Sequence, residues 1–267
     1  MKFYFPGKKF PSYSVTGSSC QLNCPHCERK YLKNMKAVET PKILLQRALD
    51  LENRNGNGFL LSGGCDLDGK VPLEGYYDIL SKIKDKTSLL INVHTGIPTK
   101  EMSEKLALIP IDVVSYDMIG SNETIKDVYR LNKSVKDFIE GYDRLKEAGL
   151  KVIPHVTIGL HRGEIKGEHR ALDIISESET IVLNSLIPSP NFGHRVYDDD
   201  YLSVLDYALM KTEAEIIIGC MRERGRYELE IEALKRGVNG MVMPNRKSIE
   251  WAEEKFDIEI VERCCAL

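Results

Sequence analysis

Three cysteines, Cys20, Cys24 and Cys27, stand in one short segment with the spacing C-x3-C-x2-C. A structural zinc site takes four protein ligands, commonly in C-x2-C pairs, and an electron-transfer cluster is completed by a fourth cysteine close by. No fourth cysteine stands near this triplet in the sequence. The spacing therefore predicts a four-iron cluster in which one iron is left open for a substrate or cofactor, although a zinc knuckle can contain the same triplet.

Cysteine usage and charge narrow the class of protein. The chain has seven cysteines, and an odd number with three in one loop favours metal in a reducing compartment over disulfides. We therefore expect a cytoplasmic protein. The net charge of -3 and the lack of a long Lys/Arg cluster predict no nucleic-acid partner. No apolar run approaches the ~20 residues of a membrane span, and the N-terminus does not resemble a signal peptide.

Short apolar runs rich in β-branched residues alternate with helical patterns, as buried parallel strands and their connecting helices do. The expected strands span Tyr13–Thr16, Gly58–Ser62, Leu89–His94, Asp112–Tyr116, Lys151–Ile158, Thr180–Leu186, Ala214–Ile218 and Val238–Met243. The expected helices include Pro41–Glu52, Lys136–Ala148, Ile165–Ser176, Asp198–Met210, Arg226–Arg236 and Ser248–Lys255. This alternation predicts an α/β fold, a (β/α)8 TIM-type barrel over residues 1–257, followed by a tail at 258–267. An open doubly wound sheet is the alternative.

Polar residues cluster at the ends of the expected strands, where barrel enzymes gather their chemistry. The cysteine loop follows the first strand, and Ser62–Cys65 follows the second. His94 ends the third strand, Asp117 follows the fourth, and Thr157 lies in the fifth. Each residue alone could be a satisfied loop or core group, but together they predict an active site.

The remaining cysteines form a second set. Cys65 and Cys220 are expected to point into the barrel mouth, and the tail with Cys264 and Cys265 could fold over that opening. Four thiolates could hold a second iron–sulfur cluster. Alternatively, Cys65 and Cys220 are small buried hydrophobic residues and the tail cysteines are incidental, or the four residues hold a structural zinc.

The cysteine loop resembles the cluster loop of the radical S-adenosylmethionine (SAM) superfamily. His26 stands before the last cysteine, where that family has an aromatic residue or His. The segment Leu60–Asp66 is similar to the family's Gly-Gly-Glu motif, with Cys65 in place of Glu. The resemblance implies a 4Fe–4S cluster on Cys20, Cys24 and Cys27, with SAM chelated to the open iron and cleaved to a deoxyadenosyl radical.

The resemblance and the strand-end positions together suggest how the cofactor is held. Ser62, Gly63 and Gly64 are candidates for the amino end of SAM, and His94 and Asp117 for its ribose or methionine end. Further cofactor-binding candidates are His26, Thr157 and Ile187, the last for adenine packing.

Over most of its length the chain is similar to the biotin synthase-like branch, and most of all to the smaller subunit of the two-subunit lipoyl synthase. The compact length, the Ser-Gly-Gly-Cys-Asp segment and the Cys-Cys tail carry this match. The match implies sulfur insertion into an octanoyl-lysyl group on a lipoyl-domain or H-protein, with an auxiliary 4Fe–4S cluster on Cys65, Cys220, Cys264 and Cys265 as the sulfur source. The implied partners are a second radical SAM lipoyl synthase subunit, the octanoylated carrier and an electron donor such as ferredoxin.

The chain also departs from its relatives. It has no cysteine motif before Cys20, unlike single-chain lipoyl synthase, and Asn92 and His94 stand in the third strand where biotin synthase has a cysteine. Three alternatives therefore stay open. One is another biotin synthase-like enzyme, with biotin, methylornithine or cofactor-maturation chemistry. Another is a radical SAM isomerase or fragmentation enzyme without an auxiliary cluster. The third is a zinc-bearing binding protein without catalysis.

Overall fold

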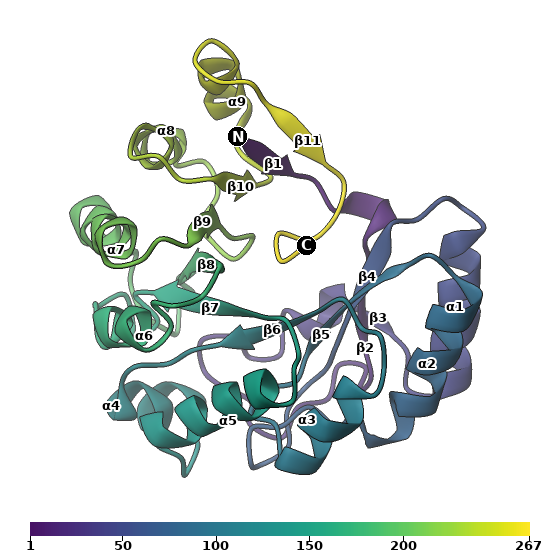
Figure 1. Cartoon of the computed structure of the whole chain (residues 1–267). Coiled ribbons are helices and arrows are strands. Elements are labelled where there is room, and N and C mark those ends of the chain that lie inside the picture. The colour runs from purple at the N-terminus through teal and green to yellow at the C-terminus, as the bar shows by residue number, and fades with distance from the viewer.

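The computed structural model describes all 267 residues. Its centre is an 11-stranded sheet with the order β11-β1-β10-β9-β8-β7-β6-β5-β4-β2-β3, in which all paired strands are parallel. The strands are β1 (Lys2–Tyr4), β2 (Ser12–Ser14), β3 (Lys36–Ala37), β4 (Gly58–Ser62), β5 (Leu90–His94), β6 (Val113–Asp117), β7 (Val152–Ile158), β8 (Thr180–Ser185), β9 (Glu215–Ile218), β10 (Gly240–Val242) and β11 (Glu259–Val261). Figure 1 shows that this sheet curls, with the helices outside the curl and the C-terminus inside it.

The helices are α1 (Pro41–Glu52), α2 (Tyr77–Lys86), α3 (Lys100–Ala107), α4 (Asn122–Thr124), α5 (Val135–Glu147), α6 (Glu168–Ile174), α7 (Asp198–Lys211), α8 (Tyr227–Lys235) and α9 (Arg246–Glu253). Short 3-10 turns cover Gly7–Lys9, Leu32–Asn34 and Glu74–Tyr76, and a π-helical turn covers Ile125–Tyr129. Local sequence sets several helix starts. Thr40 caps α1 ahead of Pro41, and Ser134 and Asp137 form a capping box on α5.

The sequence-based prediction of an α/β fold with a parallel sheet is confirmed, and all eight predicted strands are present. The barrel is partial because β1 pairs with β10 and β11, while β2 pairs with β3 and β4. Both edges of each of these two strands are therefore occupied, so β1 and β2 cannot join to close the sheet. The three strands that sequence analysis missed, β1, β3 and β11, have only two or three residues each.

Most of the core lies between the sheet and the outer helices. One cluster packs β6 to β9 against α5 to α8, and a second packs β2, β4 and β5 against α1 to α3. A third, smaller cluster includes residues of β1 and β6 to β10 together with Val261, Cys265 and Ala266. The C-terminal residues are thus part of the core inside the curl.

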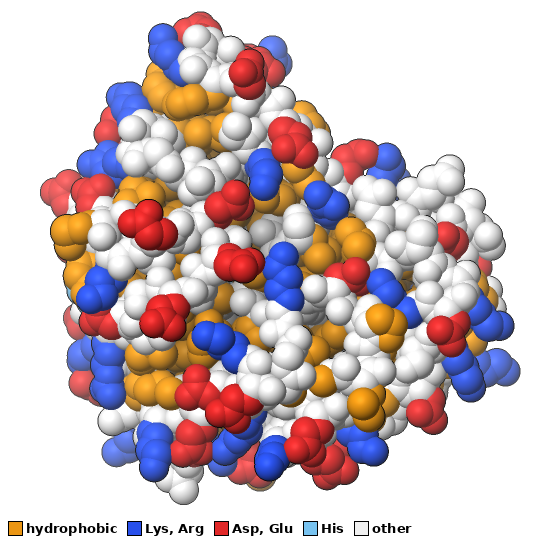
Figure 2. Space-filling view, viewed as in Figure 1, with side chains coloured by type: hydrophobic (Ala, Val, Ile, Leu, Met, Phe, Trp, Pro, Cys, Tyr) orange, Lys and Arg blue, Asp and Glu red, His pale blue; other side chains and the backbone are white.

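The outer surface is mixed in charge. Figure 2 shows acidic and basic side chains interspersed over the face drawn, without a continuous region of one sign. None of the helices combines the length and apolar character that crossing a membrane requires.

Candidate iron–sulfur and SAM site

The three cysteines of the first loop follow β2. Cys24 is buried, while Cys20 and Cys27 are half-buried, and none of them forms a disulfide. The only contacts of their sulfur atoms at hydrogen-bond range are with backbone groups. The Cys20 Sγ lies 3.7 Å from the Cys65 carbonyl, the Cys24 Sγ lies 3.5 Å from the Tyr129 carbonyl, and the Arg29 N–H donates to the Cys27 Sγ at 3.4 Å. The sulfurs are therefore free to bind metal.

Tight turns shape this loop. The Cys24 carbonyl accepts the N–H groups of Cys27 and Glu28 at 3.1 and 2.8 Å, and Asn23, Glu28 and Arg29 adopt positive φ. Burial raises the pKa of the Cys24 thiol to about 12, and the neighbouring Cys27 and Cys20 add to the shift. A metal must displace this proton on binding.

Three thiolates on one loop can hold three irons of a 4Fe–4S cluster and leave the fourth iron open. These residues therefore fit the group that the loop sequence implies.

The segment after β4 braces the cysteine loop. The Gly64 N–H donates to the Thr16 Oγ1 at 2.7 Å, and the Cys65 carbonyl accepts the Gln21 N–H at 2.9 Å. A Cβ on Gly64 would lie 2.0 Å from the Ser19 carbonyl oxygen and 2.6 Å from Cys20. The glycine is thus required by the close approach of two backbones. The role that sequence analysis gave Ser62, Gly63 and Gly64 at the amino end of SAM stays a prediction.

A cavity of about 50 Å³ adjoins the cysteine loop. Its lining includes Cys65, His94, Asp117 and Tyr129, together with Leu22 of the loop itself. Three residues predicted from strand ends, Cys65, His94 and Asp117, are therefore brought together beside the cysteine triplet. The position suits a cofactor that also reaches an open iron of the cluster.

His94 and Asp117 form a pair across the ends of β5 and β6, with Nε2 and Oδ2 3.2 Å apart. Burial lowers the pKa of His94, but the Asp117 carboxylate outweighs this effect and leaves it raised. Burial likewise raises the pKa of Asp117, and His94 outweighs it, so that the pKa is lowered. This pair favours an ionised carboxylate in the cavity.

Sequence analysis missed Tyr129. It ends the π-helical turn and is followed by Arg130 in the left-handed conformation, with φ 57°. Its ring packs edge-on against the His26 ring at 5.3 Å, and its carbonyl contacts the Cys24 sulfur. Single π turns often occur at functional sites, but nothing in the local sequence marks this one.

His26 is enclosed by aromatic rings. Besides Tyr129, the Phe192 ring lies 6.2 Å away, and the His26 Nδ1 is buried without a hydrogen-bond partner. Burial lowers the pKa of His26 to about 4. A neutral, partly unsatisfied ring beside the cysteine loop suits contact with a heterocyclic cofactor, and the role of His26 toward SAM stays a prediction.

Two predicted cofactor residues, Thr157 and Ile187, do not line the cavity beside the cysteine loop. Thr157 pairs in register with Asn184 on β8 and borders a different small cavity, together with Thr124 and Glu168. Ile187 follows β8 and is half-buried. Their roles toward SAM stay predictions.

The second set of cysteines does not gather at one point. Cys65 lies beside the first loop, where its carbonyl contacts the Cys20 sulfur. Burial raises the pKa of its thiol, and the nearby Cys20 and Cys24 add to the shift. Cys220 adjoins the tail instead, since burial and then Cys264 raise the pKa of the Cys220 thiol. The Cys264 Sγ accepts the Asn92 amide N–H at 3.3 Å, in the middle of β5. The tail therefore enters the curl and places Cys264 and Cys265 near Cys220.

Comparison with known proteins identifies the family. The family model of the radical SAM superfamily matches residues 14–173, which are more than half of the chain and include the cysteine loop. The chain belongs to the radical SAM superfamily. A search of the curated proteins found no match.

Solved structures share the fold at low identity. The FeFe-hydrogenase maturase HydG matches with a TM-score of 0.66 and 18% identity over 91% of this chain and 56% of that one. HydG from Carboxydothermus hydrogenoformans matches with a TM-score of 0.61 and 19% identity over 91% of this chain and 58% of that one. Methylornithine synthase (PylB) matches with a TM-score of 0.62 and 14% identity over 90% of this chain and 71% of that one. The chain thus spans somewhat more than half the length of the HydG chains, and at these identities the likeness concerns the fold alone.

Proposed function

We propose that this radical SAM enzyme inserts sulfur into an octanoyl group carried on a lysine of a lipoyl-domain or H-protein, as one subunit of a two-subunit lipoyl synthase. The observation that carries the proposal is the tail, which brings Cys264 and Cys265 into the curl near Cys220. Thiolates gathered inside the curl are suitable ligands for a second, sulfur-donating cluster.

The cluster and SAM, when bound, supply the deoxyadenosyl radical that removes a hydrogen atom from the substrate. The chain's own residues hold and shield the reactants. His94 keeps the Asp117 carboxylate ionised at the cavity, and Tyr129 with His26 forms an aromatic wall beside the cysteine loop. Exclusion of water by these packed groups protects a radical from side reactions.

The proposed reaction exchanges one C–H bond of the substrate for one C–S bond. A C–H bond of the octanoyl chain breaks, and its hydrogen atom goes to the deoxyadenosyl radical, giving deoxyadenosine. The auxiliary cluster, which Cys220, Cys264 and Cys265 would hold, would supply the sulfide for the new C–S bond, and one of its irons would take up the electron released. An electron donor such as ferredoxin supplies the electron that each SAM cleavage consumes. A second radical SAM subunit is the proposed partner.

The position of Cys65 favours a second candidate. Because this residue adjoins Cys20 rather than the tail, only three cysteines remain for another cluster. If the tail cysteines merely pack, as the burial of Cys265 in the inner core cluster allows, the chain is a radical SAM isomerase or fragmentation enzyme with one cluster.

Iron content separates the two candidates. Anaerobically reconstituted chain should hold about eight irons with two clusters and about four with one. We expect about eight in the unaltered chain and about four in the Cys264→Ala/Cys265→Ala variant. The exposed Ile260→Ser, on β11 of the same segment, is the matched control and should keep about eight. With the partner subunit and an octanoyl-lysyl peptide, only the forms with eight should add sulfur, as read by mass spectrometry. About four irons in the unaltered chain would refute the sulfur-donor role.

A further inference from the structure

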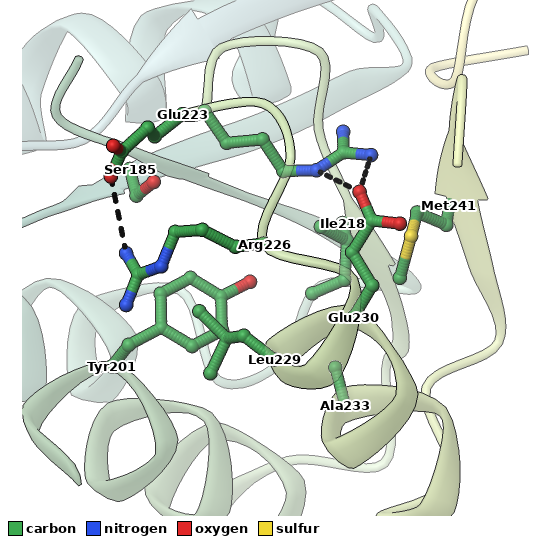
Figure 3. A pocket seen from close by; sticks show the side chains of 10 residues that line it. Ser185, Tyr201, Ile218, Glu223, Arg226, Leu229, Glu230, Ala233 and Met241 are labelled. Carbon is green, nitrogen blue, oxygen red and sulfur yellow. Dashed lines mark hydrogen bonds and ion pairs between the residues drawn. The ribbon is translucent and has the colours of Figure 1, made fainter. Parts of the chain in front are cut away.

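A buried ion pair lies next to Cys220, in the loop that follows β9. Arg222 and Glu230 have side chains that are each 6% exposed, and their charges face each other at 2.8 Å. Figure 3 shows Glu230 projecting from α8 into this region, with Arg226 and Glu223 on another side of it. The pair joins the loop after β9 to α8.

Every N–H of the Arg222 guanidinium has a role. The Nε and Nη2 groups donate to the Glu230 Oε1 at 3.3 and 2.8 Å. Nη1 donates to the carbonyls of Gly219 and Val242, both at 2.7 Å, and Nη2 also donates to the Met243 carbonyl at 3.2 Å. Only arginine presents five N–H donors in a fixed planar arrangement, so no other side chain can make this set of hydrogen bonds.

The carboxylate is equally well satisfied. Besides Arg222 on Oε1, the Glu230 Oε2 accepts the Asn245 N–H and the Ser248 hydroxyl, both at 2.7 Å. A buried ion pair is by itself weak evidence for stability, because the cost of desolvating the two charges offsets their attraction. What distinguishes this pair is that most of its remaining hydrogen bonds go to backbone groups, whose positions it fixes.

The peptide groups on both sides of Cys220 are held in place by hydrogen bonds, one of them from Arg222. The Gly219 N–H donates to Leu183, and its carbonyl accepts from Arg222. The Cys220 carbonyl accepts from Arg224 at 3.0 Å. The Met221 carbonyl accepts the Ser185 N–H at 2.7 Å. Cys220, an exposed residue, therefore stands on a backbone that is fixed at each adjoining peptide.

We propose that the Arg222–Glu230 pair, assisted by Arg224, is a positioning device that fixes the Cys220 sulfur as a cluster ligand facing the tail cysteines. The inference rests on the proposed function, because it takes Cys220 to be a ligand. The guanidinium ties the start of the Cys220 loop to the end of β10 through the Gly219 and Val242 carbonyls. The same side chain anchors this junction to α8 and, through Glu230, to the start of α9.

The test is the double variant Arg222→Met/Glu230→Leu, which removes both charges without leaving one buried alone. We expect its melting temperature to fall, because the Gly219 and Val242 carbonyls and the Asn245 N–H lose their partners, so iron is measured well below that temperature. We also expect iron to fall from about eight to about four per chain, with loss of the second cluster's electron paramagnetic resonance signal and retention of the SAM-responsive signal of the first. Arg222→Lys, which lacks the planar fork, should not restore the second cluster.

Arg226→Met is the matched control. Arg226 is a buried arginine of the same loop, but it pairs with Asp198 and Glu223 and donates to none of the peptides around Cys220. It should retain both clusters. If the double variant does not fold, Arg224→Gln decides, because this exposed residue donates directly to the Cys220 carbonyl. We expect it to lower second-cluster iron at unchanged melting temperature.

The outcomes separate the two claims. If Cys220→Ala halves the iron while the folded double variant, or Arg224→Gln in its place, keeps all of it, the positioning role is wrong and the proposed function stands. If Cys220→Ala leaves iron unchanged, Cys220 is not a ligand, and both the inference and its basis in the proposed function fail.

Discussion

The Nε2 of His94 lies 3.2 Å from the Oδ2 of Asp117, across the C-terminal ends of neighbouring strands β5 and β6. Their side chains are 25% and 37% exposed, and both line the cavity beside the cysteine loop. The pair is therefore an ion pair at the edge of the site, with its charges set by mutual attraction against a partial burial cost.

This pair predicts a pH-dependent contribution to stability. The pKa of His94 is raised on folding, so its contribution is present below the unfolded value of 6.5 and is lost as pH rises through the folded pKa. The pKa of Asp117 is lowered, so its contribution is present above 3.8 and is lost as pH falls through the folded pKa. His94→Gln should therefore lower the free energy of unfolding by no more than about 1 kcal/mol at pH 6, after solvent screening, and by less at pH 9. Urea denaturation of the metal-free chain measures both. An equal loss at the two pH values would count against the ion pair.

Gly64→Ala should remove the first cluster. The new Cβ would lie 2.0 Å from the Ser19 carbonyl oxygen, so the cysteine loop must shift. We expect iron per chain to fall by about four, with SAM cleavage lost. The control is Gly75→Ala, because a Cβ there has nothing within 4 Å. Full iron in the Gly64 variant would show that the loop tolerates the displacement.

Tyr129→Phe should weaken SAM binding without destabilising the chain. The ring that packs on His26 is kept, while the hydroxyl, which makes no hydrogen bond within the chain, is removed from the cavity wall. One lost hydrogen bond of about 0.5–1.5 kcal/mol corresponds to roughly a 2- to 10-fold loss in SAM affinity. Calorimetric titration of the reconstituted chain measures it, and unchanged affinity at unchanged iron content would place the hydroxyl outside the SAM contacts.

Much of the scaffold was predictable because buried parallel strands leave continuous apolar runs, as in β4 and β9. Strands β1 and β11 were not predictable, since each has only three residues and is defined by its pairing with distant segments, β1 with β10 and β11 and β11 with β1. The partial closure also follows from that pairing, which no local pattern encodes.

The site divides in the same way. Residue spacing predicted the cysteine loop, and strand ends predicted that His94 and Asp117 would lie at one site, but not that they would pair. Tyr129 was missed because a π-helical turn places it in the cavity wall, and that turn has no sequence signal here. Arg222 and Glu230 were missed because isolated charged residues are usually exposed. The grouping of Cys65 with the tail cysteines rested on all strand ends facing one opening, whereas the structure places it beside Cys20.

The central claim is that the loop of Cys20, Cys24 and Cys27 is the catalytic centre of a radical SAM enzyme. Its most direct test is deoxyadenosine formation from SAM by the anaerobically reconstituted chain in the presence of a strong reductant. The account predicts product from the unaltered chain and from Cys264→Ala/Cys265→Ala, and none from the variant with all three loop cysteines replaced by alanine. Undiminished deoxyadenosine from that triple variant would contradict the account.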